Sequence, residues 1–330
     1  MKKRHGLGMG IAALLTAALF IFAGCDDGST DPPPPDPLQT WTAVSDSKFG
    51  SSSIRGIAYD GSKFVAVGDD GKMAYSSNGE TWTAVGDSNF GMHINGIAYG
   101  GSKFVAVGIG SSGKMVYSSD GISWTAVADS KFGNSTISGI AYGGSKFVAV
   151  GNAGKMAYSS DGITWTAVAD SKFGSSFSYD IAYGGSKFVA VGRAGKMAYS
   201  SDGITWTAVA DSKFGSSSIQ SIAYGSGKFV AVGAVGKMAY SSDGISWTAV
   251  SDSKFGNSSI DGIAYGSGKF VAVGAVCTRA YSSDGEIWTA VSDSKFSGIF
   301  NGIFNGIAYG GGKFVAVGDR GKIAYSGAVE

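Results

Sequence analysis

The side chains that could perform metal or nucleophilic chemistry are few and far apart in this sequence. Histidine occurs at His5 and His93, and cysteine at Cys25 and Cys277. A zinc site or a Cys–His nucleophile pair needs several such residues brought together, and zinc ligands usually follow characteristic short spacings. No such spacing is present, so we predict that the chain carries neither a metal nor a cofactor.

The carboxylates are distributed as structural residues would be. Beyond the first forty residues glutamate occurs at Glu80, Glu286 and Glu330, whereas an aspartate recurs once per repeat in a D-S-K-F segment, as at Asp129 and Asp170. A retaining glycosidase needs two carboxyl groups about 5 Å apart at one unique place. A carboxylate that recurs at every period suits a turn better, and we predict that the chain is not an enzyme.

The positions of most of these residues follow from a repeat in the amino-acid sequence. Each unit reads W-T-A-V-x-D-S-K-F-G, then I-A-Y, K-F-V-A-V-G and G-K-M-A-Y-S-S-D-G, with variable segments between. A period in the forties, with short segments rich in Val, Tyr and Phe separated by Gly, Ser and Asp, is typical of a β-propeller blade. The units are marked by seven tryptophans: Trp41, Trp82, Trp124, Trp165, Trp206, Trp247 and Trp288.

Each unit supplies four strands. In the second complete unit we expect them at Ile97–Tyr99, Lys103–Val107, Lys114–Ser118 and Ser123–Val127. The K-F-V-A-V run is apolar on both faces, which indicates a sheet covered on both sides, as a blade is by its two neighbours. Frequent glycine and the lack of a sustained 3.6-residue pattern exclude a helical solenoid, so an open β-solenoid is the remaining rival.

The two ends of the repeat array favour a closed ring. No eighth tryptophan segment follows the last unit, and the array begins with an isolated W-T-A-V at Trp41–Val44. Because an open stack would leave sheet edges unpaired, we predict that this segment pairs with the last unit. The sequence therefore predicts an all-β, seven-bladed β-propeller over residues 39–330, with four antiparallel strands per blade and a ring closed by Trp41–Val44.

The beginning of the chain differs in composition from the repeats. A basic K-K-R start precedes an apolar run at residues 11–23, which is shorter than the roughly 20 apolar residues of a transmembrane helix. The run ends in F-A-G-C, which resembles the lipobox of bacterial lipoproteins, although that family prefers leucine where Phe22 stands. The resemblance implies a signal peptide at residues 1–24, a lipid on Cys25, and a location on the periplasmic or surface side of the bacterial cell envelope.

Two other interpretations of this segment stay open: an ordinary secretory peptide cleaved nearby, and an uncleaved anchor. Residues 25–38 contain D-D-G-S-T-D-P-P-P-P-D-P, whose acidic residues and consecutive prolines favour extended polyproline II, at roughly 3.1 Å per residue. We therefore expect a spacer between a lipidated Cys25 and the propeller. A lipidated Cys25 cannot form a disulfide with Cys277, so the core must supply the stability.

The third and fourth strands of the units are joined by a recurrent S-S-D-G turn that leads into tryptophan, as at Ser159–Trp165. Its aspartate can accept backbone N–H bonds and its glycine can adopt positive φ. The turn resembles the Asp-box of sialidase-like propellers, one residue shorter; in that family the boxes lie opposite the active face, and the catalytic arginines and Tyr–Glu pair are not found here. A structural role is implied for Asp120, Asp161, Asp202, Asp243 and Asp284.

The units differ most in the loops that one face of a propeller presents. At one aligned position, expected just before the first strand and at the channel mouth, they carry Arg55, Asn95, Ser138, Tyr179, Gln220, Asp261 and Asn305. The loops between second and third strands, and a G-I-F-N duplication in the last unit, add Asp69, Asp70, Arg193, Asp319, Arg320, Phe300 and Phe304. We predict a ligand-binding face formed by these residues, with neutral drift in permissive loops as the alternative.

The charge balance excludes one class of partner. Without residues 1–24 the chain has 23 positive and 25 negative residues, so it lacks the basic footprint of a nucleic-acid-binding protein. We expect a membrane-tethered, monomeric binding module whose ligand is a glycan or a protein. An assembly or scaffold factor that docks other envelope proteins, and a degenerate glycoside hydrolase, remain alternatives.

Overall fold

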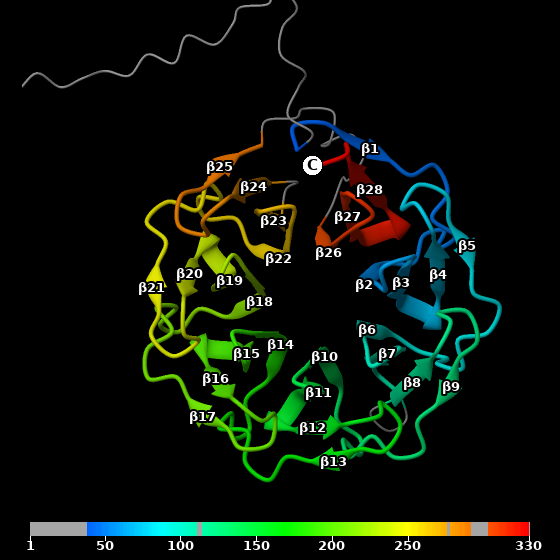
Figure 1. Cartoon of the computed structure of the whole chain (residues 1–330), viewed down its shortest axis with the longest axis horizontal. Coiled ribbons are helices and arrows are strands. Elements are labelled where there is room, and N and C mark those ends of the chain that lie inside the picture. The colour runs from blue at the N-terminus through cyan, green and yellow to red at the C-terminus, as the bar shows by residue number, and fades with distance from the viewer. Residues whose placement is uncertain (1–37, 111–113, 276–277, 292–302, 330) are drawn as a thin grey trace, which may run out of the picture. The chain divides into compact units, whose positions relative to one another are not determined.

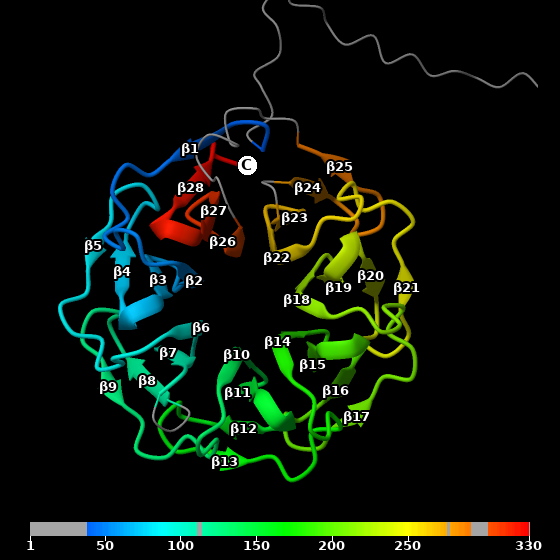
Figure 2. The same cartoon turned by 180° about the vertical axis from the view of Figure 1, so that it is seen from behind.

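Seven four-stranded antiparallel sheets surround a central channel in the computed structural model, which describes residues 38–110, 114–275, 278–291 and 303–329 (Figures 1 and 2). The prediction of a seven-bladed β-propeller with four antiparallel strands per blade is confirmed. Within the described residues no helix is both long and apolar enough to cross a membrane.

The strands of each blade follow one another from the channel outward. Blades 1 to 3 contain β2 (Ile54–Tyr59), β3 (Phe64–Gly68), β4 (Met73–Ser76), β5 (Thr83–Ala84), β6 (Ile94–Gly100), β7 (Lys103–Gly108), β8 (Lys114–Ser118), β9 (Thr125–Ala126), β10 (Ile137–Gly143), β11 (Lys146–Gly151), β12 (Met156–Ser159) and β13 (Thr166–Ala167). Blades 4 to 6 contain β14 (Ser178–Gly184), β15 (Lys187–Gly192), β16 (Met197–Ser200), β17 (Thr207–Ala208), β18 (Ile219–Gly225), β19 (Lys228–Gly233), β20 (Met238–Ser241), β21 (Thr248–Ala249), β22 (Ile260–Gly266), β23 (Lys269–Gly274), β24 (Arg279–Ser282) and β25 (Thr289–Ala290).

Blade 7 joins the two ends of the propeller. It contains β26 (Phe304–Gly310), β27 (Lys313–Gly318), β28 (Ile323–Ser326) and, outermost, β1 (Trp41–Ala43). Short 3-10 turns connect second to third strands at η1 (Asp69–Gly71), η2 (Asn152–Gly154), η3 (Arg193–Gly195), η4 (Ala234–Gly236) and η6 (Asp319–Gly321).

The first and fourth strands differ in length from the predictions. In the second blade the first strand begins at Ile94, three residues earlier than expected, because the variable segment before I-A-Y is itself extended and paired. The fourth strand shrinks to Thr125–Ala126, since it pairs on one side only and its last bond runs from Val127 N to Met115 O, at 2.9 Å.

The core is a set of dry interfaces between neighbouring blades. Between blades 1 and 2, Val65 and Val67 of β3 pack against Phe104 and Ala106 of β7. Successive strand residues point to opposite faces, so the valines of each F-V-A-V run face the next blade and its Phe and Ala face the previous one. The same pairing recurs at the other interfaces. This is why the second strands are apolar on both faces.

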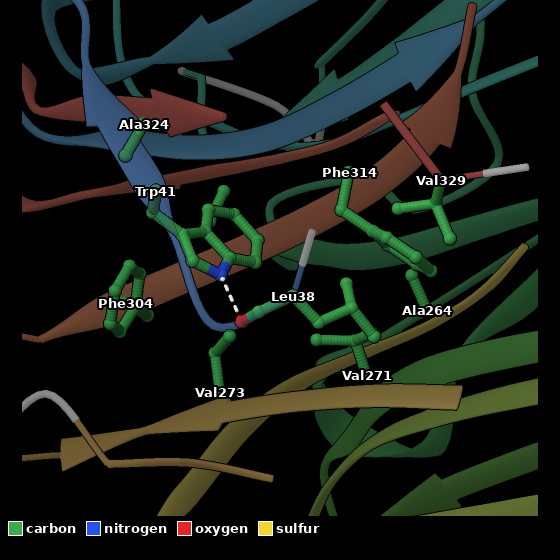
Figure 3. Packing of buried hydrophobic residues seen from close by; sticks show 10 residues of the cluster. Leu38, Trp41, Ala264, Val271, Val273, Phe304, Phe314, Ala324 and Val329 are labelled. Atoms are coloured by element: carbon green, nitrogen blue, oxygen red, sulfur yellow. Dashed lines mark hydrogen bonds between the residues drawn. The ribbon is translucent and has the colours of Figure 1, made fainter. Parts of the chain in front are cut away.

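The ring closes as predicted. Trp41 pairs with Ser326 and Ala43 with Ala324, and Val44 N donates to Ile323 O at 2.9 Å. Figure 3 shows that Trp41 Nε1 donates to Leu38 O, at 3.0 Å, inside the cluster between blades 6 and 7. In three other blades the corresponding tryptophan donates to the glycine carbonyl of the turn before it, namely Trp82 to Gly79, Trp165 to Gly162 and Trp288 to Gly285. The segment before Trp41 therefore supplies the same kind of acceptor where no such turn precedes the strand.

Candidate functional site

The seven residues predicted at the channel mouth form one ring around the channel, here called the mouth ring. They lie inside the first strands, not just before them as expected. In blade 1, Ile54 pairs with Gly68 and Gly56 pairs with Val67, so Arg55 is the extra residue of a β-bulge. The same register shift occurs in every other blade. A bulge redirects its unpaired residue, and here all seven line the channel.

The channel contains two cavities, both lined in part by the mouth ring. The mouth holds about 520 Å³ and the cavity behind it about 200 Å³. The next residue along each first strand is a glycine in five blades, but Asp180 in blade 4 and Ser221 in blade 5. Asp180 was missed by the sequence analysis, although the comparison of aligned repeats one position further along would have identified it.

Asp180 connects two blades from within the channel. Its Oδ2 accepts hydrogen bonds from Ser221 Oγ at 2.8 Å and Ile222 N at 3.1 Å, and its Oδ1 accepts from Ile181 N at 2.8 Å. Burial raises the pKa of this carboxyl above its usual value, and these donors oppose the shift. Part of its surface still faces the cavity, but protein encloses the carboxyl itself, so desolvation dominates. We interpret Asp180 as a structural link.

The amide members of the mouth ring also have structural partners. Asn95 Nδ2 donates to Ile137 O in the next blade at 2.9 Å, and Asn305 Nδ2 donates to Ile54 O at 3.0 Å across the closure between blades 7 and 1. Both bonds tie neighbouring first strands together at the mouth. These two positions therefore have a stabilising role whether or not a ligand binds.

The charged loop residues divide into those near the ring and those outside it. Arg55 pairs with Asp69, and His93 Nδ1 lies 2.9 Å from the same Asp69 oxygen. Asp319 accepts a hydrogen bond from Asn305 Nδ2 at 3.0 Å. The pKa of Asp261 is raised, first by burial and then by the negative charge of Asp319. Blade 6 therefore places the Asp261 carboxylate at the mouth, and blades 7 and 1 place Asp319 and Asp69 against members of the mouth ring.

None of the loop residues predicted at the turns between second and third strands lines the mouth itself, although Asp69 and Asp319 contact members of the mouth ring. Asp70 and Arg320 occupy the left-handed position of their 3-10 turns, with φ of 59° and 54°, and neither lines the mouth. Asp70 instead accepts a hydrogen bond from Ser52 Oγ at 2.7 Å.

The prediction for Phe304 is wrong. This side chain is fully buried in the core between blades 6 and 7, because it takes the place that isoleucine holds at the start of most other first strands. Among the described residues of the duplication, Ile303 is exposed and lines the mouth. Phe300 and Cys25 lie outside the described residues.

Blade 4 places an aromatic pair and a cation beside the channel. The ring centroids of Phe177 and Tyr179 are 6.5 Å apart, and the guanidinium carbon of Arg193 lies 5.7 Å from the Phe177 centroid. Phe177 was not predicted; its signal is an aromatic residue where the other units carry mostly small or polar side chains. Tyr179 is the aromatic member of the mouth ring.

The turn aspartates accept hydrogen bonds from the backbone of their own turns. Asp161 Oδ1 accepts hydrogen bonds from Ile163 N and Thr164 N, each at 2.8 Å, and from Ser159 Oγ at 2.9 Å. These turns lie away from the mouth, on what we call the turn face, where a lysine at the start of the second strand contacts the turn of the next blade in blades 1, 5 and 7. Lys63 Nζ, for example, donates to Asp120 O in the next blade at 2.8 Å.

Among the described residues no group of three or more His, Cys, Asp or Glu side chains could hold a metal ion. The chemical groups gathered at the mouth are instead amides, hydroxyls, carboxylates, guanidinium groups and aromatic rings. Such a mixture can form directional hydrogen bonds and ion pairs with a polar ligand.

Comparisons with known proteins support the propeller fold and do not identify a ligand. No family model matches the chain, and no curated protein matches its sequence. YCF48 bound to D1 peptide aligns with a TM-score of 0.68 and 16% identity, over 88% of this chain and 94% of that chain. A catalytically inactive virginiamycin B lyase from Staphylococcus aureus with quinupristin aligns with a TM-score of 0.73 and 12% identity, over 88% and 99%.

A third structure is an enzyme of a different kind. The GH74 enzyme of Niastella koreensis aligns with a TM-score of 0.63 and 22% identity, over 84% of this chain and 43% of that chain. At these identities the likeness shows a shared propeller fold. Function on such a scaffold has to be argued from the site.

Proposed function

We propose that the chain is a non-catalytic binding module, held at a bacterial membrane by a lipid on Cys25, whose channel mouth binds a protein segment or a glycan. The observation that carries this proposal is the mouth ring. The blades repeat almost unchanged, yet the bulge position holds six different residue types. Most of these side chains contribute little to the core, so they can vary to match a ligand without cost to the fold.

Two of the similar structures contain a ligand, which supports a binding role for this fold. YCF48 holds a D1 peptide and the inactive lyase holds quinupristin. Their chemistry differs, as expected of a scaffold that hosts many functions. We further propose that the S-S-D-G turns are Asp-boxes of the sialidase-like type, with a purely structural role.

The carboxylates support the non-catalytic part of the proposal. Glu80 and Glu286 are ion-paired on the turn face with Lys313 and Lys228. Asp180 is held by three donors. The hydrolase alternative therefore rests on Asp261 and Asp319. In an aryl-glycoside hydrolysis assay we expect no turnover by the wild-type protein, and no difference between it and Asp261→Asn. Sustained turnover that Asp261→Asn abolishes would overturn the non-catalytic assignment.

The binding test compares two triple variants of the detergent-solubilised full-length protein. The mouth variant carries Arg55→Ala, Tyr179→Ala and Asp261→Ala. The control carries Ile122→Ala, Ile163→Ala and Ile204→Ala, which remove exposed side chains from the turn face. Glycan and peptide arrays probed with wild-type protein should give ligands that the mouth variant loses and the control keeps. Ligands lost equally by both variants would contradict the assignment of the mouth.

The arrays also separate the two forms of the proposal. Absence of binding to the glycan array, together with an envelope protein that co-purifies with wild type but not with the mouth variant, would identify a docking or assembly factor. The D1 peptide held by YCF48 is the observation that favours this second candidate.

The lipid anchor has its own test. Cys25→Ser removes the thiol that a lipid would modify, so the variant should leave the membrane fraction while the wild-type protein stays there. A Cys277→Ser variant, which removes the other cysteine, should fractionate as wild type. Retention of the Cys25→Ser protein in washed membranes would rule out anchoring through this residue.

A further inference from the structure

Blade 4 departs from the repeat at the mouth more than any other blade. Its first strand and the residue before it read Phe177-Ser178-Tyr179-Asp180, where most blades read a small or polar residue, then Ile-x-Gly. The residues aligned with Phe177 are Ser53, His93, Thr136, Ser218, Ser259 and Ile303. Those aligned with Arg193 are Asp69, Ile109, Asn152, Ala234, Ala275 and Asp319. An aromatic pair beside a cation is therefore found in this blade alone.

The backbone fixes this cluster, defined as Phe177, Tyr179 and Arg193. Arg193 N donates to Phe177 O at 3.0 Å, which holds the two residues side by side where the loop leaves the strand. The guanidinium lies over the Phe177 ring, at 5.7 Å from its centroid. A guanidinium over an aromatic face can still donate from its N–H groups to a ligand.

Arg193 is also an uncompensated charge. Arg55 is neutralised by Asp69, whereas exposed Arg193 makes no ion pair within the part of the chain that the structure describes. Asp261, whose carboxylate lines the mouth, and the neighbouring Asp319 belong to blades 6 and 7. An anionic ligand is therefore repelled by one side of the mouth and attracted to blade 4.

We propose that the blade 4 cluster recognises an acidic peptide segment, with a ligand carboxylate on the Arg193 guanidinium and the neighbouring residue against Tyr179. This inference rests on the proposed binding function and names its ligand class. A planar guanidinium can bind a carboxylate through two parallel N–H bonds. A peptide is favoured over an acidic glycan because Arg193 lies over Phe177, so that of the two rings only Tyr179 lines the mouth, where a sugar could stack.

The test starts from a displayed library of random peptides, selected on the detergent-solubilised full-length protein. We expect selected sequences to be enriched in Asp and Glu relative to the library. For the strongest peptide, Arg193→Gln should weaken binding about tenfold, as loss of one charge-assisted bidentate contact does. Arg193→Lys should recover part of the loss, and the matched control Arg320→Gln, on the same type of turn outside the mouth, should bind as wild type.

A double-mutant cycle ties the effect to a carboxylate. Replacing each acidic residue of the peptide by its amide should identify one position whose loss matches that of Arg193→Gln, with no further loss when both changes are combined. Binding to wild type should also weaken with added salt, and the salt dependence should diminish in Arg193→Gln.

The outcomes distinguish this inference from the broader proposal. Peptides without acidic enrichment, or equal affinity for wild type and Arg193→Gln, would overturn the ligand class; the binding function would still stand if the mouth triple variant abolished binding. Binding of acidic glycans alone, sensitive to Arg193→Gln, would replace the peptide by a glycan. Ligands that no mouth substitution affects would overturn both proposals.

Discussion

At the scale of single residues, the pKa values of the repeated turn aspartates and of the variable channel aspartates are shifted in opposite directions. Hydrogen bonds, led by the one from Ser123 N, lower the pKa of Asp120 in its turn to about 2. Burial raises the pKa of Asp180 and of Asp261 in the channel. The turns thus use ionised carboxylates as acceptors, whereas the channel makes ionisation costly.

Asp120→Asn should separate hydrogen bonding from charge. Asn78 already stands at this position in blade 1 and accepts from Glu80 N at 2.9 Å and Thr81 N at 3.0 Å, so the neutral-pH cost should stay below about 1 kcal/mol. Because the folded pKa of Asp120 is depressed to about 2, its charge stabilises the fold above the unfolded pKa of about 3.9, and this contribution is lost as pH falls.

Melting temperatures of wild type and Asp120→Asn, compared from about pH 6 down to about pH 2, should therefore converge or cross in favour of the variant. A difference that stays constant with pH would contradict the assigned role of the charge. Asp120→Ala is the control for the acceptor, and it should lose stability by about 1–2 kcal/mol at neutral pH.

Ser178 is a second position with a definite prediction. It is fully buried, and its hydroxyl has no hydrogen-bond partner among the described residues, whereas five other blades place isoleucine there. Ser178→Ile removes an unsatisfied polar group and buries more apolar surface, so the free energy of unfolding should rise by about 1–2 kcal/mol.

The reciprocal change in blade 5 is the matched control. Ile219 is fully buried at the aligned position, and Ile219→Ser should lower the free energy of unfolding by about 2–5 kcal/mol in denaturant titrations. A Ser178→Ile protein that is less stable than wild type would mean that the neighbouring side chains of blade 4 have adjusted to serine.

At the scale of elements, each end of the first strands has its own structural role. Their bulges direct the mouth ring into the channel, and their last glycines receive a tyrosine from the next blade. At Gly143 an added Cβ would overlap the ring of Tyr183, which lies in β14. The recurrent I-A-Y segment of the sequence indicates these strands, but the tight contact between blades follows from their packing.

Gly143→Ala should destabilise the propeller by about 1–3 kcal/mol, because Tyr183 and the strand behind it must move. Gly86→Ala is the control: nothing lies within 4 Å of its added Cβ, and the change should stay within about 0.5 kcal/mol. Urea denaturation measures both. Equal stability of the two variants would show that Tyr183 moves aside without loss of stability.

At the scale of the whole molecule, one short strand holds the ring closed. Trp41 is buried to 6% exposure between blades 6 and 7, and the Arg279 guanidinium lies 5.7 Å from its ring. Every other fourth strand is attached to the propeller at both ends, whereas β1 has propeller on one side only (Figure 1). β1 can therefore detach without unfolding a neighbouring blade, and its detachment exposes the edge of β28.

Trp41→Ala should both destabilise the protein, by about 3–5 kcal/mol, and open this edge. Hydrogen exchange in β28 should accelerate more than exchange elsewhere, and light scattering should detect self-association. Trp165→Ala is the matched control, since it removes the same side chain from blade 3 but leaves β13 attached at both ends. Uniform acceleration of exchange in both variants would contradict a weak seam.

The number of blades, the four strands in each, the closing role of Trp41–Val44 and the S-S-D-G turns can be inferred from the amino-acid pattern alone, because each follows from a local pattern repeated in register. Which variable residues share a surface depends instead on tertiary contacts. The bulge that redirects Arg55 and its equivalents, the burial of Phe304, and the meeting of Arg193 with Phe177 depend on register and on contacts between elements. Local periodicity does not encode those contacts, whereas the closed ring imposes them.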